Sequence, residues 1–265
     1  MLNLRFKYIV ITSLFFVLHN IPKANKMIRY WDRYTDEERE KMACKIIDHM
    51  KRRGRTVTDL YGVKNIQPVA KRTVQEDGTV TADHPGTVYF ANHQGKYDAI
   101  GVMLALEKPC PTLWDIHSAS RLVGKQVSGL LDCSIVDLRD MKDKVRAIQA
   151  TVEKVKSGRD FLIFPEGGYT DNHNELQEFH SGCFAVSLKT KAPIVPTVLY
   201  DAYKSMNSNT FEKVVTQIHF LDPIYYDEYK DMRKVEICEL VKSRIEARLK
   251  DIKNGVDLGA PDKRI

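Results

Sequence analysis

The part of the chain that follows residue 87 alternates short apolar runs with stretches of helical periodicity, and no other feature limits the fold as strongly. Each apolar run is dense in β-branched or aromatic residues, which is typical of buried strands. The expected strands are residues 87–91, 133–138, 160–166 and 194–200. Strands separated by helices predict an α/β domain with a mixed, largely parallel sheet flanked by helices.

Two helical stretches in this part each have one apolar face. The first, at 141–158, is expected to end at Gly158 and to bury Val145, Ile148, Val152 and Val155. The second, at about 232–252, is expected to turn four residues inward: Val235, Val241, Ile245 and Leu249. The run 194–200 contains Pro196, so we expect it beside an irregular stretch or at an edge of the sheet.

Before residue 87 the pattern is first helical and then typical of a hairpin. Thr35 and Glu38 have the spacing of a capping box, which predicts a helix from there to about Gly54. Asp77 and Gly78 are typical of a β-hairpin turn. We therefore expect an N-terminal helical segment over 1–55 and an α/β domain over 56–265.

The net charge of +6 lies in the first fifth of the chain. Residues 1–55 hold 13 Lys and Arg against 6 Asp and Glu, whereas the remaining residues hold 28 against 29. Within this basic part lie eleven uncharged and mostly apolar residues, 8–18, which are about half of the ~20 that a helix needs to span a bilayer. We expect this segment to lie in one leaflet, or dip into it, with its basic flanks on anionic headgroups. The alternative is a buried core helix.

Other locations and partners fit the sequence less well. No small-x-small cleavage site follows the apolar stretch, which argues against a signal peptide. The five cysteines are scattered and form no CxxC pair, which favours a reduced protein that faces the cytosol. A basic patch can bind nucleic acid, but the adjoining apolar residues favour an anionic membrane surface instead. We therefore expect no nucleic-acid partner and a location at the cytoplasmic face of a membrane.

Polar residues with catalytic potential lie where one of the expected strands ends. In NHQGKYD (92–98), Asp98 follows His93 by five residues. An imidazole can take the proton of an attacking hydroxyl at neutral pH, and a carboxylate on its other nitrogen fixes the tautomer. The alternative is that Asp98 only caps a helix and that His93 is a loop residue.

Two further stretches could bind an anion. FPEGG (164–168) continues a strand into a tight loop with Glu166 and Gly167, and such a loop exposes backbone N–H groups. Arg139, after the strand at 133–138, is a bidentate donor suited to phosphate or carboxylate. The alternatives are that the FPEGG loop is an ordinary turn and that Arg139 forms only a surface ion pair. No cluster of metal ligands is evident in the sequence, so we expect neither a metal nor a cofactor.

Together and in this order, these blocks resemble the 1-acyl-glycerol-3-phosphate acyltransferase family of glycerolipid acyltransferases. NHQGKYD matches the family's N-H-x4-D block, the stretch ending at Arg139 its G…R block, FPEGG its F-P-E-G block, and residues 178–196 its V-P block. The resemblance covers about residues 85–200. It also implies a membrane-associating element ahead of the α/β domain.

The resemblance implies acyl transfer without a covalent enzyme intermediate. His93, oriented by Asp98, would be the general base for the free hydroxyl of 1-acylglycerol-3-phosphate, a lysophospholipid. That hydroxyl would attack an acyl thioester and give phosphatidate. Arg139, Glu166 and Gly167 would belong to the acceptor site. The donor would be acyl-CoA or acyl carrier protein, and the sequence does not distinguish them.

Three departures from the family pattern concern the headgroup of the acceptor. The family's FPEG block usually continues Thr-Arg, whereas this chain has Gly-Tyr at 168–169. A lysine that is frequent in the V-P block is His180 here, and the basic pair usual before the G…R block is Ala-Ser at 119–120, with Arg121 adjacent. Arg121, Tyr169 and His180 are therefore also candidate substrate-binding residues. The alternatives are the same transfer to another lysophospholipid, a thioester hydrolase, or a non-catalytic membrane-binding protein that keeps the fold.

Overall fold

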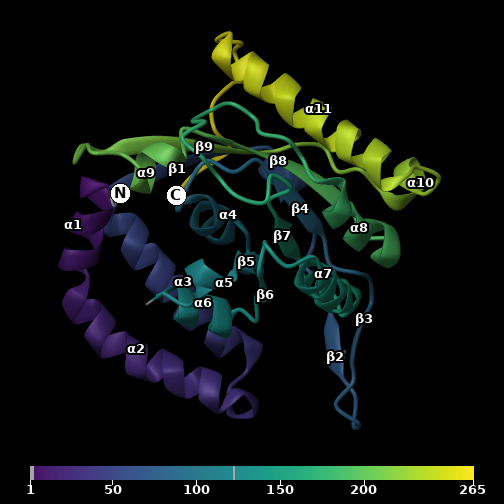
Figure 1. Ribbon diagram of the computed structural model, residues 1–265, viewed down its shortest axis with the longest axis horizontal. Helices are drawn as coiled ribbons and strands as arrows, with labels where there is room; N and C mark the ends of the chain where they lie inside the picture. Colours follow the sequence, from purple (N-terminus) through teal and green to yellow (C-terminus); the bar gives the residue numbers. More distant parts are fainter. Residues whose placement is uncertain (1–2, 122) are drawn as a thin grey trace.

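A mixed β-sheet forms the centre of the protein in a computed structural model, which describes residues 3–121 and 123–265. In these residues six strands pair in the order β10-β1-β9-β8-β4-β7 (Figure 1). The strands are β1 (Thr56–Tyr61), β4 (Val88–Ala91), β7 (Phe161–Ile163), β8 (Ile194–Tyr200), β9 (Val214–Phe220) and β10 (Lys263–Arg264). The pairs β1–β9, β8–β4 and β4–β7 are parallel, whereas β8–β9 and β1–β10 are antiparallel. The expected mixed sheet is confirmed.

Helices cover both faces of this sheet (Figure 1). The core on one face of the sheet includes residues of α1 (Leu4–Thr12), α2 (Leu14–Arg29), α3 (Asp36–Arg53), α4 (Asp98–Ala105) and α6 (Gly124–Leu130), with α2 packed on α3 and α6. The other packs against α7 (Met141–Lys156), α8 (Ala185–Thr190) and α11 (Lys234–Lys253). The connections contain short helices, α5 (Ile116–Ala119), α9 (Tyr203–Met206) and α10 (Tyr226–Tyr229). Because strand side chains alternate, Tyr89 and Ala91 enter the first core while Val88 and Phe90 enter the second.

The local signals before residue 87 fold as expected. The Thr35 side chain accepts the N–H of Glu38 and closes the capping box at the start of α3, which ends just before Gly54. Gly78 adopts φ +83° in the hairpin that joins β2 (Arg72–Val74) to β3 (Val80–Ala82). This positive φ is why the turn favours glycine.

Three expectations were wrong in detail. The strand expected at 133–138 is the shorter β6 (Ser134–Val136), which pairs with β5 (Leu113–Asp115) in a separate two-stranded sheet. Val145 and Val235 do not face the core but are 65% and 53% exposed. Val235 lies in the first turn of α11 and Val145 at the start of the second turn of α7, and the buried stripe begins further along, at Ala147 in α7 and at Ile237 in α11.

Pro196 lies in a central strand, so the edge position that we considered for residues 194–200 is wrong. β8 pairs with β4 on one side and β9 on the other. The alternative expectation, an irregular stretch, is confirmed. The regular ladder with β9 begins only at Thr197, and an isolated bridge joins Ile194 to Ile224. Pro196 lies between these two pairings. Because the β8–β9 ladder needs no N–H from residue 196, proline is tolerated there.

The N-terminal apolar stretch is broken into two helices at Ser13. α1 and α2 are bent by 67° at this break, and only as a pair do they have the length and composition of a membrane span; among the described helices no single one does. The buried Ser13 Oγ lies 3.2 Å from Nε2 of His49 in α3, and the His49 ring stacks on Phe16 with centroids 3.8 Å apart. Arg5 anchors α1 by donating to the backbone carbonyls of Thr210 (2.8 Å), Glu212 (2.9 Å) and Gly54.

The order of the parallel strands brings three loops together at one edge of the sheet. In the register of the sheet Phe90 lies beside Ile163 of β7, and Ala91 lies beside Thr197 of β8. The loops that leave β4 and β7 and the turn after β8 therefore start close to one another. In parallel sheets this edge is where functional residues gather.

Candidate active site

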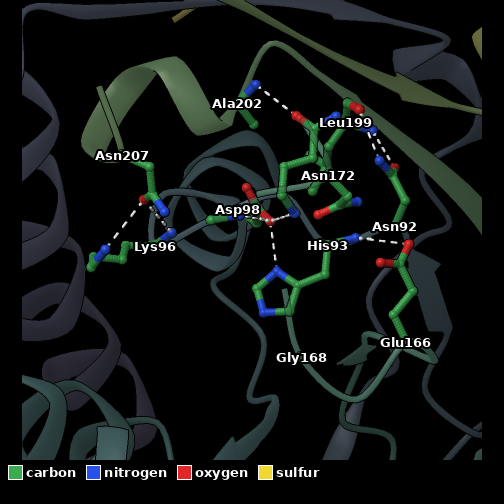
Figure 2. A network of polar contacts seen from close by, with 12 residues as sticks. Asn92, His93, Lys96, Asp98, Glu166, Gly168, Asn172, Leu199, Ala202 and Asn207 are labelled. Atoms are coloured by element: carbon green, nitrogen blue, oxygen red, sulfur yellow. Dashed lines mark hydrogen bonds and ion pairs between the residues drawn. The ribbon is translucent and has the colours of Figure 1, made fainter. Parts of the chain in front are cut away.

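His93 and Asp98 form a direct pair in the loop that leaves β4. His93 Nδ1 lies 2.6 Å from Asp98 Oδ2, and the same oxygen accepts the backbone N–H groups of Gly95 (2.8 Å) and Gln94 (Figure 2). Asp98 is fully buried and is the first residue of α4. It therefore organises the turn before the helix and binds the imidazole at the same time. The pairing expected from the spacing of five residues is present.

This geometry leaves the other ring nitrogen of His93 available. An ionised carboxylate can only accept hydrogen bonds, so Nδ1 carries the proton and Nε2 is the basic nitrogen. In Figure 2, Nε2 points away from Asp98. The His93 side chain is 17% exposed. A hydroxyl that reaches Nε2 could pass its proton to a base whose tautomer is already set.

Two aromatic rings from the loop after β7 hold the imidazole in place. The Phe164 ring stacks on His93 with centroids 4.2 Å apart and an angle of 17° between the planes. The Tyr169 ring meets the His93 ring edge-on, with centroids 4.8 Å apart. The ring is thus fixed by Asp98 at one nitrogen and by aromatic contacts at its face and edge.

Glu166 connects the loop after β7 to the loop after β4. Its Oε1 accepts the backbone N–H of His93 at 3.2 Å, and its Oε2 accepts Nε2 of Gln177 at 2.5 Å. Burial raises the pKa of Glu166, and these two hydrogen bonds oppose that shift. Gly167, at φ +72°, makes the turn, and a Cβ there would lie 3.3 Å from Cδ2 of His180. Glu166, Gly167 and His180 therefore lie in one loop region beside His93.

Replacing Glu166 by alanine should lower both stability and activity. The His93 N–H would lose its acceptor, which typically costs about 1–3 kcal/mol, and the Gln177 amide would keep only the Gly168 carbonyl. A chain of this size loses ~2–4 °C in Tm for each kcal/mol. Glu239→Ala, on the exposed side of α11, is the matched control. A thermal melt of Glu166→Ala that coincides with that of the wild type would show that this connection does not hold the loops.

Three amide side chains that the sequence analysis did not single out complete the support of this loop. Asn92 Oδ1 accepts the N–H of Leu199 at 2.8 Å, and its Nδ2 donates to the Leu199 carbonyl at 3.0 Å. Gln94 Oε1 accepts the N–H of Ala202 at 2.8 Å, and its Nε2 donates to Asn174 at 2.8 Å. Asn92 and Gln94, which flank His93, were the signal in the sequence. Amides that follow a buried strand are themselves buried and need hydrogen-bond partners.

The two candidate arginines lie in different surroundings. Arg121 is exposed, and its positive charge lowers the pKa of Lys96 and opposes the raised pKa of Tyr169, for both of which burial is the larger cause. Arg139 is also exposed, and its guanidinium donates to Asp137 at 3.0 and 3.1 Å within its own loop. Its role at the acceptor stays a prediction. Across residues 3–121 and 123–265, no three His, Cys, Asp or Glu side chains are grouped to hold a metal ion.

Comparison with known proteins identifies related chains. A 1-acyl-sn-glycerol-3-phosphate acyltransferase of Salmonella typhimurium is 21% identical over 171 residues, which are 64% of this chain and 69% of that protein. A chloroplastic 1-acyl-sn-glycerol-3-phosphate acyltransferase of Brassica napus is 27% identical over 154 residues, 57% of this chain and 43% of that protein. The resemblance expected from the sequence is thus confirmed.

The fold is that of a solved acyltransferase. The crystal structure of the 1-acyl-sn-glycerophosphate (LPA) acyltransferase PlsC from Thermotoga maritima superposes with a TM-score of 0.64. The match covers 92% of this chain and 98% of that protein at 17% identity. The sequence model of the Acyltransferase family matches residues 64–200, which include His93, Asp98 and Glu166. Since this match spans more than half of the sequence, the chain belongs to the Acyltransferase family.

Proposed function

We propose that this protein transfers a fatty acyl group from an acyl thioester to the free hydroxyl of 1-acylglycerol-3-phosphate, also called lysophosphatidic acid, and so makes phosphatidate. The observation that carries the proposal is the pair of His93 and Asp98, joined at 2.6 Å, with the other ring nitrogen unengaged by Asp98. Membership of the Acyltransferase family and the substrates named for the Salmonella and Brassica relatives support the reaction class.

In the proposed reaction Nε2 of His93 takes the proton of the acceptor hydroxyl as its oxygen attacks the thioester carbonyl. The new C–O ester bond forms and the C–S bond breaks. The imidazolium then returns the proton to the departing thiolate, so the base is regenerated in each cycle. Asp98 stabilises the imidazolium while the negative charge develops on the substrate. Neither the donor's carrier, CoA or acyl carrier protein, nor its chain length follows from this geometry.

Product analysis tests this function directly. Purified protein is incubated with a radiolabelled acyl thioester, as acyl-CoA or acyl carrier protein, and a panel of lysophospholipids, and the labelled lipids are separated by chromatography. We expect labelled phosphatidate from 1-acylglycerol-3-phosphate. Label in a different phospholipid only would reassign the acceptor. Free fatty acid at the same rate with and without acceptor would show a hydrolase, and no product would favour a non-catalytic protein.

We further propose that α1 and α2 bind this protein to an anionic membrane surface, where both substrates partition. Their outer side carries seven exposed apolar residues: Leu4, Tyr8, Val10, Ile11, Leu14, Phe15 and Leu18. Basic residues flank this apolar surface. The opposite side is buried through Ile9, Ala24 and Met27. One face of the segment is therefore part of the core and the other is apolar and exposed. A buried core helix describes the first face, and a membrane-binding segment describes the second.

Phe15→Glu combined with Ile11→Glu should release the protein from anionic vesicles. Phe15 is 87% exposed and Ile11 72% exposed, so neither change disturbs the core. Each side chain contributes up to ~1.5–3 kcal/mol when buried in lipid, so the pair should lower partitioning by at least about 100-fold. High salt alone should release only a minor fraction, because salt screens charge but not apolar burial.

Vesicle flotation with the full chain measures this effect, and Val235→Glu on α11 is the matched control at another exposed apolar residue. Deletion of residues 1–22 is a poorer test because Arg5 and Ile9 are buried. Equal flotation of the double variant and the wild type would contradict the role of α1 and α2. Complete release of the wild type by salt would assign binding to charge alone.

A further inference from the structure

The chain lacks the arginine that the family pattern usually has as the second residue after the F-P-E-G block. Tyr169 occupies that position, and its ring lies against the His93 ring. A phosphate monoester beside the base must nevertheless be neutralised, because a buried dianion without a cation is strongly unfavourable. The compensating charge should therefore come from another residue near Tyr169.

Lys96 meets this requirement. Its ammonium lies 5.7 Å from the centroid of the Tyr169 ring and 5.4 Å from that of Phe6 in α1. Lys96 lies three residues after His93, in the turn that Asp98 organises through the N–H groups of Gln94 and Gly95. The position of this cation relative to the base is therefore set by the same short turn.

The Lys96 ammonium has unused hydrogen-bonding capacity. It donates to Oδ1 of Asn207 at 3.4 Å, and its own backbone N–H donates to the same oxygen at 3.2 Å (Figure 2). An ammonium has three donors. Within the described residues no carboxylate forms an ion pair with it, although Asp171 is close enough to act on its charge. A half-buried ammonium with one weak amide partner and two aromatic neighbours can accept an anionic ligand.

Arg121 adds a second positive charge to this location. Burial lowers the pKa of Lys96, and the positive charge of Arg121 lowers it further. Burial raises the pKa of Tyr169, and Arg121 partly opposes that shift. The positive charges of Lys96 and Arg121 disfavour one another, and a bound anion would relieve this repulsion. This arrangement is unfavourable without a ligand and favourable with one.

We propose that Lys96, assisted by Arg121, binds the phosphate monoester of the acceptor, and that the Tyr169 ring, which contacts His93 and faces the Lys96 ammonium, positions Lys96. This inference rests on the proposed function, since it names the group that recognises the headgroup in that reaction. The residues that supply the charge differ from those in the family pattern.

Steady-state kinetics of the full-length protein test the inference. Lys96→Gln should raise KM for 1-acylglycerol-3-phosphate by about 10-fold or more, as expected for loss of a hydrogen bond between charged groups. KM for the acyl donor should change by less than about 2-fold. Lys96→Arg should restore most of the affinity, and Arg121→Gln should give a smaller rise. Lys142→Gln, an exposed lysine of α7, is the control for loss of one positive charge.

Arg139→Gln in the same assay tests the competing assignment, in which Arg139 binds the acceptor phosphate. A rise in acceptor KM with Arg139→Gln but not with Lys96→Gln would overturn the proposal and place the phosphate at Arg139. Equal changes in both substrates' KM for Lys96→Gln would also overturn it, because Lys96 would then act on the loop and not on the headgroup. If Lys96→Gln failed to fold, an unchanged acceptor KM in Arg121→Gln would count against the site. Failure of the proposed function is distinct, because the wild type would then form no phosphatidate.

Discussion

Replacing His93 by alanine should lower kcat by about 10²–10⁴-fold or more while the protein stays folded. The variant removes the imidazole that would accept the hydroxyl proton, but the backbone N–H of residue 93 can still donate to Glu166. Asp98 would also keep its two backbone donors, Gln94 and Gly95. The measurement is kcat at saturating donor and acceptor, together with circular dichroism and a thermal melt.

His117→Ala is the matched control, since His117 is exposed on α5. It should leave kcat unchanged. If His93→Ala kept more than about a tenth of wild-type turnover, His93 would not be the general base, because a positioned base contributes at least about 100-fold.

Asp98→Asn should keep the fold and still lower kcat strongly, by up to about 10⁴-fold as for the corresponding change in serine proteases. The amide oxygen can accept the three N–H groups that now converge on Oδ2. The amide NH2 would take the place of Oδ1, which has no hydrogen-bond partner among the described residues. The shape is therefore preserved, and the negative charge that stabilises the imidazolium is lost.

Asp98→Ala provides the contrast. It removes the acceptor for two backbone N–H groups as well as the charge, so it should lower Tm more than Asp98→Asn does, where only the new NH2 group lacks a partner. The two variants thus separate orientation of the loop from electrostatic stabilisation of the base. An Asp98→Asn variant with nearly wild-type kcat would show that the charge is unimportant and that Asp98 has a structural role.

The parts of the site that lie within one short segment could be predicted from the sequence. His93 and Asp98 are five residues apart at the start of a helix, so their contact depends on local geometry alone. The capping box at Thr35 and the hairpin at Gly78 were predictable for the same reason. Each of these features is fixed by residues within a few positions of one another.

Features that depend on distant segments could not be predicted in this way. Asn92 binds Leu199 across 107 residues, and Gln94 binds Ala202 across 108. The proximity of Lys96 to Phe6 depends on how α1 packs, which no local pattern specifies. The central position of the strand that contains Pro196 could not be predicted, because residue propensity does not reveal where the ladder with the neighbouring strand stops. In each case tertiary packing, which local sequence patterns do not encode, decided the outcome.

The amide pairs that flank His93 have a consequence for chimaeric proteins built from members of this family. The segment matched by the family model ends at residue 200, yet Gln94 is held by the N–H of Ala202, just beyond that limit. A domain exchange cut at residue 200 would therefore transplant the base while leaving one of its anchors in the recipient chain. A crossover placed after α9, at about residue 208, would transfer His93 together with Ala202, which binds Gln94, and Asn207, which binds Lys96.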